Sequence, residues 1–216
     1  MLDLLLPQCC VVCSRSGVQL CERCLALLPR IVGPLCDRCG APTAWPVRRC
    51  RHCAGRRLAF AHARAAVVYE ESARAFVAAW KDRGLRRLVD AAAEVVVEVV
   101  PRPSAPLTFV PADSDRSLRR GHEPPRRLAE ALAERWNLPL ERLLGRGRHV
   151  RAQRGLTRAE RSRNLRGAFA AKRSPRHVTL IDDVFTSGAT ANAAASALRK
   201  AGAARVEVVT FARVVR

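Results

Sequence analysis

One segment, residues 178–190, constrains the fold of this chain more than any other, because it joins a strand, a turn and a helix in a fixed order. The run Val178–Ile181 is apolar or β-branched, and two adjacent carboxylates, Asp182 and Asp183, follow it. A turn of small residues comes next, and an alanine-rich segment typical of a helix begins after it. This order predicts a tight loop between the carboxyl end of a strand and the amino end of a helix, as in α/β proteins.

A loop at that position is suited to bind phosphate. Backbone N–H groups at a helix start are unpaired and carry positive partial charge. Gly188 lets the backbone approach a ligand, and the neighbouring hydroxyls add hydrogen-bond donors. The Asp182 and Asp183 carboxylates can accept hydrogen bonds from sugar hydroxyls or hold a hydrated Mg²⁺. The loop residues are Thr186, Ser187, Gly188, Ala189 and Thr190.

The simpler alternative is an ordinary strand-to-helix turn with a Ser/Thr cap. Such a turn does not require Asp182 and Asp183 to be adjacent at the end of a strand, where their like charges repel. The paired carboxylates therefore favour a binding site.

The first 53 residues contain all nine cysteines, and eight of these form four Cys-x-x-Cys pairs. Two thiolates at this spacing can bind one tetrahedral metal ion, and two such pairs complete a shell of four sulfurs. The start, Met1–Pro7, has no basic flank and carries Asp3, so we expect a cytoplasmic location rather than secretion. Paired cysteines in the cytoplasm favour two structural zinc sites over disulfides. The ligands are Cys10, Cys13, Cys21, Cys24, Cys36, Cys39, Cys50 and Cys53.

The cysteine pairs can share the two ions in sequential or in crossed order. We expect sequential pairing, because each metal then closes the shorter loop at lower entropic cost. Cys9 is left over, although its spacing from Cys13 would let it replace Cys10.

The composition describes a protein with a packed core and no membrane span. The 216 residues can form one full domain and a small one, and 49% of them are hydrophobic. The most apolar stretch, Ala91–Val100, is interrupted by Glu94 and Glu98 and is too short to cross a bilayer.

The net charge of +20 is concentrated in one part of the chain. Residues 115–177 contain 18 Arg and Lys against 6 Asp and Glu. Such a stretch would attract phosphates, either on a small nucleotide or along a nucleic acid, or it could be a solvated basic surface. Aromatic residues make up only 5% of the chain, and no nucleic-acid motif with interleaved aromatics occurs.

After about Leu58, strand and helix patterns alternate, which predicts a mostly parallel sheet flanked by helices, with ligands at the carboxyl ends of the strands. We therefore expect a cysteine-rich module over residues 1–57 and an α/β domain over residues 58–216. The expected strands are Ala65–Tyr69, Leu107–Pro111, Leu138–Leu144, His177–Asp182 and Arg205–Val214. The expected helices are Ser72–Lys81 with Ser72 as N-cap, Leu85–Val100, Pro124–Arg135 and Ala189–Ala201.

Residues 178–190 resemble the motif with which type I phosphoribosyltransferases bind 5-phosphoribosyl pyrophosphate (PRPP). The family pattern is a hydrophobic strand, two acidic residues, two variable residues and a Thr/Ser-Thr/Ser-Gly-x-Thr loop, and every element is present here.

The whole chain resembles the ComF/GntX family, which joins a double zinc ribbon to a type I phosphoribosyltransferase domain. One departure is that His122-Glu123-Pro124 stands where the family continues with Phe-Asn-Gln. The matching elements are the four cysteine pairs, Trp80-Lys81-x-x-Gly84, Val110-Pro111, Arg120-Gly121, Arg151-x-Gln153-x-x-Leu156, Arg161-x-x-Asn164, Gly167-Ala-Phe169 and the Asp182–Thr190 segment.

The resemblance implies transfer of a 5-phosphoribosyl group from Mg²⁺–PRPP to an acceptor, an activity of the pentosyltransferase class of glycosyltransferases. Asp182 and Asp183 would be the catalytic pair, and Thr186–Thr190 would hold the 5′-phosphate. The pyrophosphate side would be Ala112, Asp113 and Arg120, and a basic lid would include Arg151, Gln153, Arg161 and Asn164.

An alternative is a catalytically weak or inactive PRPP- or nucleotide-binding protein. It would act in DNA uptake during natural transformation, through single-stranded DNA and protein partners, because the family includes competence proteins. The chain stops at Arg216, just after the last expected strand, so we expect no hood over an acceptor from that end. The zinc module is then the candidate cover, and its sequence offers no recognisable base-reading pocket.

Overall fold

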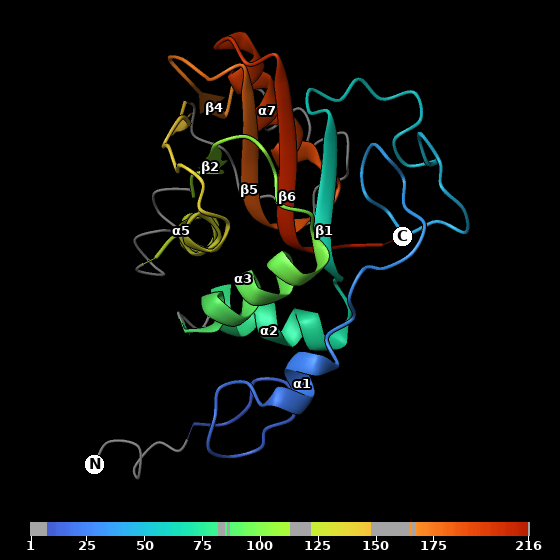
Figure 1. Ribbon diagram of the computed structural model, residues 1–216, viewed down its shortest axis with the longest axis vertical. Helices are drawn as coiled ribbons and strands as arrows, with labels where there is room; N and C mark the ends of the chain where they lie inside the picture. Colours follow the sequence, from blue (N-terminus) through green and yellow to red (C-terminus); the bar gives the residue numbers. More distant parts are fainter. Residues whose placement is uncertain are drawn as a thin grey trace.

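A parallel β-sheet forms the centre of the protein in a computed structural model that describes residues 8–81, 85, 87–112, 122–147, 165 and 167–215. Its four strands lie in the order β1-β6-β5-β2, and β3 and β4 form a separate antiparallel pair (Figure 1). The strands of the main sheet are β1 (His62–Val68), β2 (Leu107–Phe109), β5 (His177–Phe185) and β6 (Arg205–Arg213). The short pair consists of β3 (Gly145–Arg146) and β4 (Phe169–Ala170).

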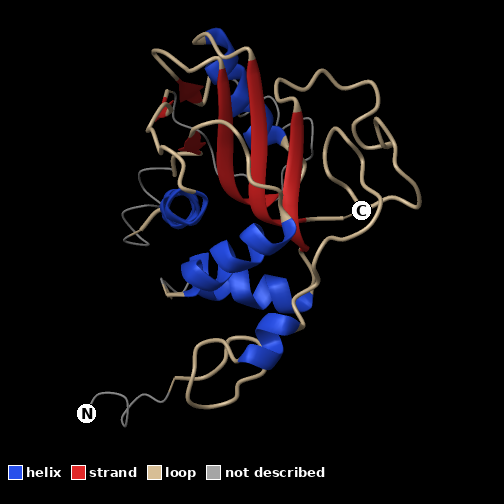
Figure 2. Ribbon diagram, viewed as in Figure 1, coloured by secondary structure: helices blue, strands red, loops and turns tan. Residues whose placement is uncertain are grey.

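Helices cover both faces of this sheet (Figure 2). In the central strands, Ile181 and Phe211 pack toward α2, α3 and α5, whereas Leu180 and Val208 pack toward α7. This alternation follows from the two-residue period of a strand that is buried on both faces. The predicted α/β fold is therefore confirmed. The helices are α1 (Glu22–Ala26), α2 (Glu71–Lys81), α3 (Leu88–Val99), α5 (Pro124–Trp136) and α7 (Ala189–Lys200).

Several element bounds differ from the sequence-based expectations. β5 continues to Phe185, because Val184 and Phe185 still pair with β6, so both motif carboxylates lie inside the strand. Ser72 is not an N-cap, since α2 begins one residue earlier, at Glu71. The predicted strand over residues 138–144 is reduced to one isolated bridge between Leu140 and Leu107.

The N-terminal module covers the outer edge of β1. The Ile31 N–H donates to the Ala66 carbonyl, and the Val68 N–H donates to the Pro29 carbonyl, both at 2.8 Å. Farther along β1, the Ala63 N–H donates to the Arg38 carbonyl at 3.1 Å. An open sheet edge invites pairing with other chains, and the segment over residues 29–40 occupies this one.

The two cysteine clusters differ in how they join the α/β domain. Buried cysteines of the second cluster, such as Cys36 and Cys53, share one hydrophobic core with α7 and the sheet. The buried cysteines of the first cluster, including Cys10 and Cys24, form a small core of their own. The division at residues 57 and 58 stays a prediction. Among the described helices, none is both long enough and apolar enough to traverse a bilayer.

Candidate functional site

A tight turn connects β5 to α7, at the place that the sequence predicted. Gly188 has a left-handed φ of 73° and is the N-cap of α7. A Cβ at Gly188 would lie 2.6 Å from the Phe185 ring, so the close packing of this ring requires glycine. The Ala189 N–H lies 3.4 Å from the Ser187 Oγ, and the Asn192 N–H donates to the Gly188 carbonyl at 2.9 Å.

A cavity of about 210 Å³ opens beside this turn, and we call it the loop cavity. Both motif carboxylates line it together with Thr186 and Thr190, the first and last residues of the loop. Ser187, Gly188 and Ala189 are not on its wall. The other lining residues are Lys81, Val110, Pro111, Ala112, Pro124, Pro125, Arg146, Leu165, Phe169 and Val184. The structure thus gathers the ends of α2, β2 and β5 around one small space.

The two carboxylates of the loop cavity have different partners. Asp183 forms an ion pair with the Lys81 ammonium group. The backbone N–H of Asp183 donates to Asp182 Oδ1 at 2.9 Å. Burial, together with repulsion from Asp183, raises the pKa of Asp182 to about 7, although Lys81 and Arg146 favour its ionised form. A cation that enters beside Asp182 would therefore help this carboxyl group to lose its proton.

Two cations of the loop cavity were not assigned to the site from the sequence. Lys81 was noted only as part of a family segment, and Arg146 was not singled out. Arg146 Nε donates to the Pro111 carbonyl at 3.1 Å, and its guanidinium lies 4.8 Å from the centre of the Phe169 ring. A signal for Lys81 was available, because this arginine-rich chain contains only two other lysines, Lys172 and Lys200.

The residues that depart from the family pattern have structural partners near the loop cavity. Glu123 Oε1 accepts a hydrogen bond from the Ala112 N–H at 3.2 Å. The buried His122 places Nε2 3.0 Å from the Trp80 carbonyl oxygen, next to Lys81 in the chain. Six predicted site residues lie outside the described residues, namely Asp113, Arg120, Arg151, Gln153, Arg161 and Asn164.

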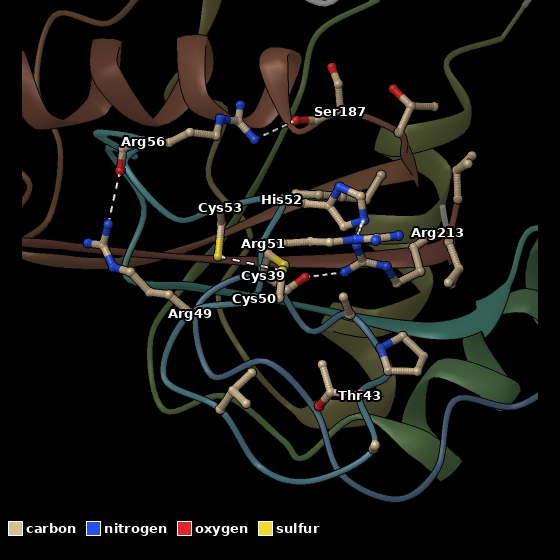
Figure 3. A pocket seen from close by; sticks show the side chains of 18 of the residues that line it. Cys39, Thr43, Arg49, Cys50, Arg51, His52, Cys53, Arg56, Ser187 and Arg213 are labelled. Atoms are coloured by element: carbon tan, nitrogen blue, oxygen red, sulfur yellow. Dashed lines mark hydrogen bonds between the residues drawn. The ribbon is translucent and has the colours of Figure 1, made fainter.

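A larger cavity, of about 450 Å³, lies between the second cysteine cluster and the loop (Figure 3). We call it the ribbon cavity. One wall comes from residues 39–56 of the N-terminal module and includes Trp45, Arg51 and His52. The opposite wall comes from residues 185–187 and 213–215. This cavity was not predicted from the sequence, because its two walls are more than 100 residues apart in the chain.

The eight predicted zinc ligands form two clusters in sequential order, as expected. Cys10, Cys13, Cys21 and Cys24 make up the first cluster, and Cys36, Cys39, Cys50 and Cys53 make up the second. Within the second cluster, the Cys36 and Cys53 sulfurs are 3.5 Å apart, and the Cys39 and Cys50 sulfurs are 3.6 Å apart. Zinc–sulfur bonds of about 2.3 Å in a tetrahedron give sulfur separations of about 3.8 Å, so this geometry fits zinc and not disulfides.

Two comparisons with known proteins agree with this architecture. The profile of the double zinc ribbon domain matches residues 1–54. Competence protein F of Haemophilus influenzae is 34% identical over 142 residues, which is 62% of this chain. Together, the two matches support assignment of the chain to a ComF-like family. The match also spans 62% of the length of Competence protein F.

In this ComF-like protein, the double zinc ribbon profile covers both Cys₄ clusters. Each cluster therefore fits one zinc ion, and we call the two halves of the module the first ribbon and the second ribbon. The second ribbon, built around Cys36–Cys53, is the one that faces the loop after β5.

Proposed function

We propose that this ComF-like protein binds Mg²⁺–PRPP in the loop cavity and transfers its 5-phosphoribosyl group to an acceptor. The observation that carries the proposal is the meeting of Asp182, Asp183, Thr186 and Thr190 in one cavity at the start of α7. Within residues 182–190, these groups offer partners for a sugar diol, a metal ion and a phosphate.

The 5′-phosphate would lie against the loop over residues 186–190. The N-terminus of the 12-residue helix α7 supplies unpaired N–H groups and positive partial charge there. The Thr186 and Thr190 hydroxyls on the cavity wall would add two further donors.

The ribose hydroxyls and a hydrated Mg²⁺ would lie at Asp182 and Asp183. Mg²⁺ prefers oxygen ligands and keeps several waters, which suits two carboxylates beside a substrate phosphate. The raised pKa of Asp182 reflects burial next to a second carboxylate. A nearby cation would therefore lower the free energy needed to ionise Asp182. When bound, the ion would neutralise charge on the pyrophosphate.

The pyrophosphate would lie toward the end of β2, where Ala112 lines the loop cavity. Lys81 and Arg146 bring positive charge to this wall. In this proposal Asp113 and Arg120 would also bind the pyrophosphate, and Arg151, Gln153, Arg161 and Asn164 would act as a lid, although all six lie outside the described residues. Cations at these positions would stabilise the negative charge of the departing group.

The transfer exchanges one bond at ribose C1 for another. The bond from C1 to the pyrophosphate oxygen breaks, and its electron pair leaves with pyrophosphate. A lone pair of the acceptor forms the new bond to C1, and a proton on that acceptor atom passes to water. The protein would act mainly by positioning the two partners and by stabilising charge.

Isothermal titration calorimetry with Mg²⁺–PRPP tests the binding step. The wild-type protein should bind, and the double variant Asp182→Asn/Asp183→Asn should lose affinity by at least about 100-fold, since each carboxylate provides charge-assisted hydrogen bonds. Asp90→Asn on α3, away from the loop cavity, is the matched control. Equal affinity of the double variant and the wild type would remove the site assignment.

A screen for pyrophosphate release tests the transfer step. PRPP and Mg²⁺ would be incubated with nucleobases, nucleotides and small amines, and release would be compared with that of the double variant. Acceptor-dependent release by the wild type alone would support a transferase. Tight PRPP binding without pyrophosphate release would indicate a nucleotide-binding protein and not a transferase.

A second candidate function is DNA uptake in the cytoplasm, through single-stranded DNA and protein partners. The observation that favours it is the name of the relative, Competence protein F, together with the net charge of +20. Affinity for a labelled single strand should then fall steeply with salt, as expected when cationic side chains displace counterions. A flat salt dependence would argue against this function.

A further inference from the structure

The ribbon cavity has no role in the site described above, which uses only the loop cavity. We propose that the ribbon cavity is the acceptor site and that it takes a small, flat aromatic anion. The proposal rests on the proposed phosphoribosyl transfer and names the chemical class of its second substrate. Three observations support it: the position, the charge and the aromatic content of this cavity.

The position comes first. Thr186 lines both the loop cavity and the ribbon cavity, while Phe185 and Ser187 line the ribbon cavity only. The two cavities therefore adjoin at Thr186, so a ligand in the ribbon cavity would lie next to a phosphoribosyl group in the loop cavity. Its volume of about 450 Å³ falls within the range of small-molecule sites, which is about 300–1,000 Å³.

The net charge of the lining is positive. Its charged residues are Arg49, Arg51, Arg56 and Arg213, and none of the lining residues is acidic. A four-thiolate zinc site carries a net charge of about −2, which four arginines exceed. Arg56 and Arg213 are already bonded to the backbone carbonyls of Ser187 and Cys39.

Arg51 is the cation of the lining that best suits a ligand. Its side chain is exposed and extends along the cavity beside His52 and Arg213 (Figure 3). Its Nε lies 3.4 Å from His52 Nε2. The two outer nitrogens of the guanidinium carry further N–H donors that can bind an anion.

The aromatic content points to a flat ligand. Trp45 lines the ribbon cavity and is 69% exposed, whereas the other two tryptophans, Trp80 and Trp136, are buried. Phe185 and Val214 add apolar atoms to the same lining. A large indole left in water beside an apolar wall offers a stacking surface for a planar ring.

Trp45 also supplies the measurement, because it is the exposed member of the three tryptophans in the chain. The probe is orotate, a pyrimidine with a ring carboxylate, and the matched control is uracil, the same ring without that carboxylate. Titration of the zinc-loaded full chain, without PRPP or Mg²⁺, should show saturable quenching by orotate. Uracil at matched absorbance should bind at least about tenfold more weakly.

Variants locate the binding. Arg51→Gln should weaken orotate binding about five- to tenfold, because it removes the charged donor but keeps a polar side chain. Arg48→Gln, an exposed arginine of the same ribbon that does not line the cavity, should bind like the wild type. Trp45→Phe should lose the fluorescence change and retain calorimetric binding at reduced affinity.

Three results would overturn the proposal: no saturable quenching by orotate, equal affinity for uracil, or full affinity of Arg51→Gln. Quenching by an oligothymidine strand in place of orotate would also overturn it and would assign the cavity to nucleic acid. Since orotate is titrated without PRPP, these results are independent of the calorimetric test of the loop cavity. A negative result for orotate in the ribbon cavity can therefore be distinguished from a negative result for Mg²⁺–PRPP in the loop cavity.

Discussion

Arg56 of the second ribbon donates a hydrogen bond of 3.0 Å to the carbonyl of Ser187, in the loop between β5 and α7. A second bond lies close by, since the Ala59 N–H donates to Asn192 Oδ1 of α7 at 2.7 Å. The zinc module therefore contacts the loop itself through Arg56, and Ala59, just after the module, contacts the first turn of the helix that follows. We infer that the second ribbon helps to hold the loop over residues 186–190 in place.

Replacement of Arg56 tests this coupling. Arg56→Ala should leave the fold intact and increase amide hydrogen exchange over residues 186–190 by about fivefold, because it removes one charge-assisted hydrogen bond that is partly exposed to water. Arg57→Ala, an exposed neighbour, is the control. Unchanged exchange in Arg56→Ala would show that the loop holds its conformation without the ribbon.

The two zinc sites should differ in their effect on stability. Cys24→Ser and Cys53→Ser should each reduce the zinc content from about two ions per chain to about one. Cys24 lies in a small separate core, so its loss should change the unfolding temperature of the α/β domain by only a few degrees. Cys53 lies in the core shared with α7, so its loss should lower that temperature by about 10 °C or more.

The control for both zinc variants is Cys9→Ser. Cys9 is exposed and belongs to neither cluster, so this variant should retain two zinc ions. Elemental analysis and calorimetric unfolding provide the two measurements. Equal destabilisation by Cys24→Ser and Cys53→Ser would contradict the assignment of the two ribbons to different cores.

The parts of the structure that depend on local spacing could be predicted from the sequence. Two cysteines with two residues between them meet in any tight turn, and the entropy of loop closure favours sequential pairing, so both clusters were predicted. The turn around Gly188 was predictable because a strand, two acids and small residues follow one another without a gap. Such features do not depend on how distant segments pack.

The remaining parts depend on tertiary packing, which spacing does not encode. Lys81 reaches Asp183 across about 100 residues of chain, and only the packing of α2 on the sheet brings them together. Residues 29–40 lie along β1, and the ribbon that follows brings Trp45 into one cavity lining with Phe185. Ser72 was misjudged because cap preference is weaker than the packing that fixes where α2 begins.

Gly188→Ala should be more destabilising than a matched glycine variant. Gly188 and Gly202 both have positive φ, so a Cβ costs about 1–2 kcal/mol at either position. At Gly202 the nearest atom to that Cβ is 3.7 Å away, whereas at Gly188 the Phe185 ring would be 2.6 Å away. Overpacking of this kind costs a further 1–3 kcal/mol or so.

Denaturant unfolding of the two glycine variants gives the measurement. The free energy of unfolding should fall by about 1–2 kcal/mol for Gly202→Ala and by roughly 2–5 kcal/mol for Gly188→Ala. Phe185→Leu combined with Gly188→Ala should recover part of the loss by removing the ring contact. Similar losses for both single variants would show that the Phe185 contact is unimportant.

The raised pKa of Asp182 predicts how stability depends on pH in magnesium-free buffer. An unfolded aspartate loses its proton near pH 4, whereas folded Asp182 keeps its proton up to about pH 7. Between these values the folded state binds more protons than the unfolded state, so stability falls as pH rises. Above about pH 7 the ionised, buried Asp182 lowers the stability of the folded state by its full amount, and below about pH 4 this loss of stability is absent.

Asp182→Asn should remove this cost, because asparagine is uncharged at every pH and its amide oxygen can still accept the Asp183 N–H. At pH 8 the variant should be more stable than the wild type by roughly 2–4 kcal/mol, and at pH 4 the two should be nearly equal. The exposed Asp90→Asn should show no comparable gain. Denaturant unfolding across this pH range gives the measurement, and a constant difference between Asp182→Asn and the wild type would mean that Asp182 is ionised throughout. Added Mg²⁺ should narrow the gap at pH 8, since a cation near Asp182 and Asp183 stabilises the wild-type charge that the variant lacks.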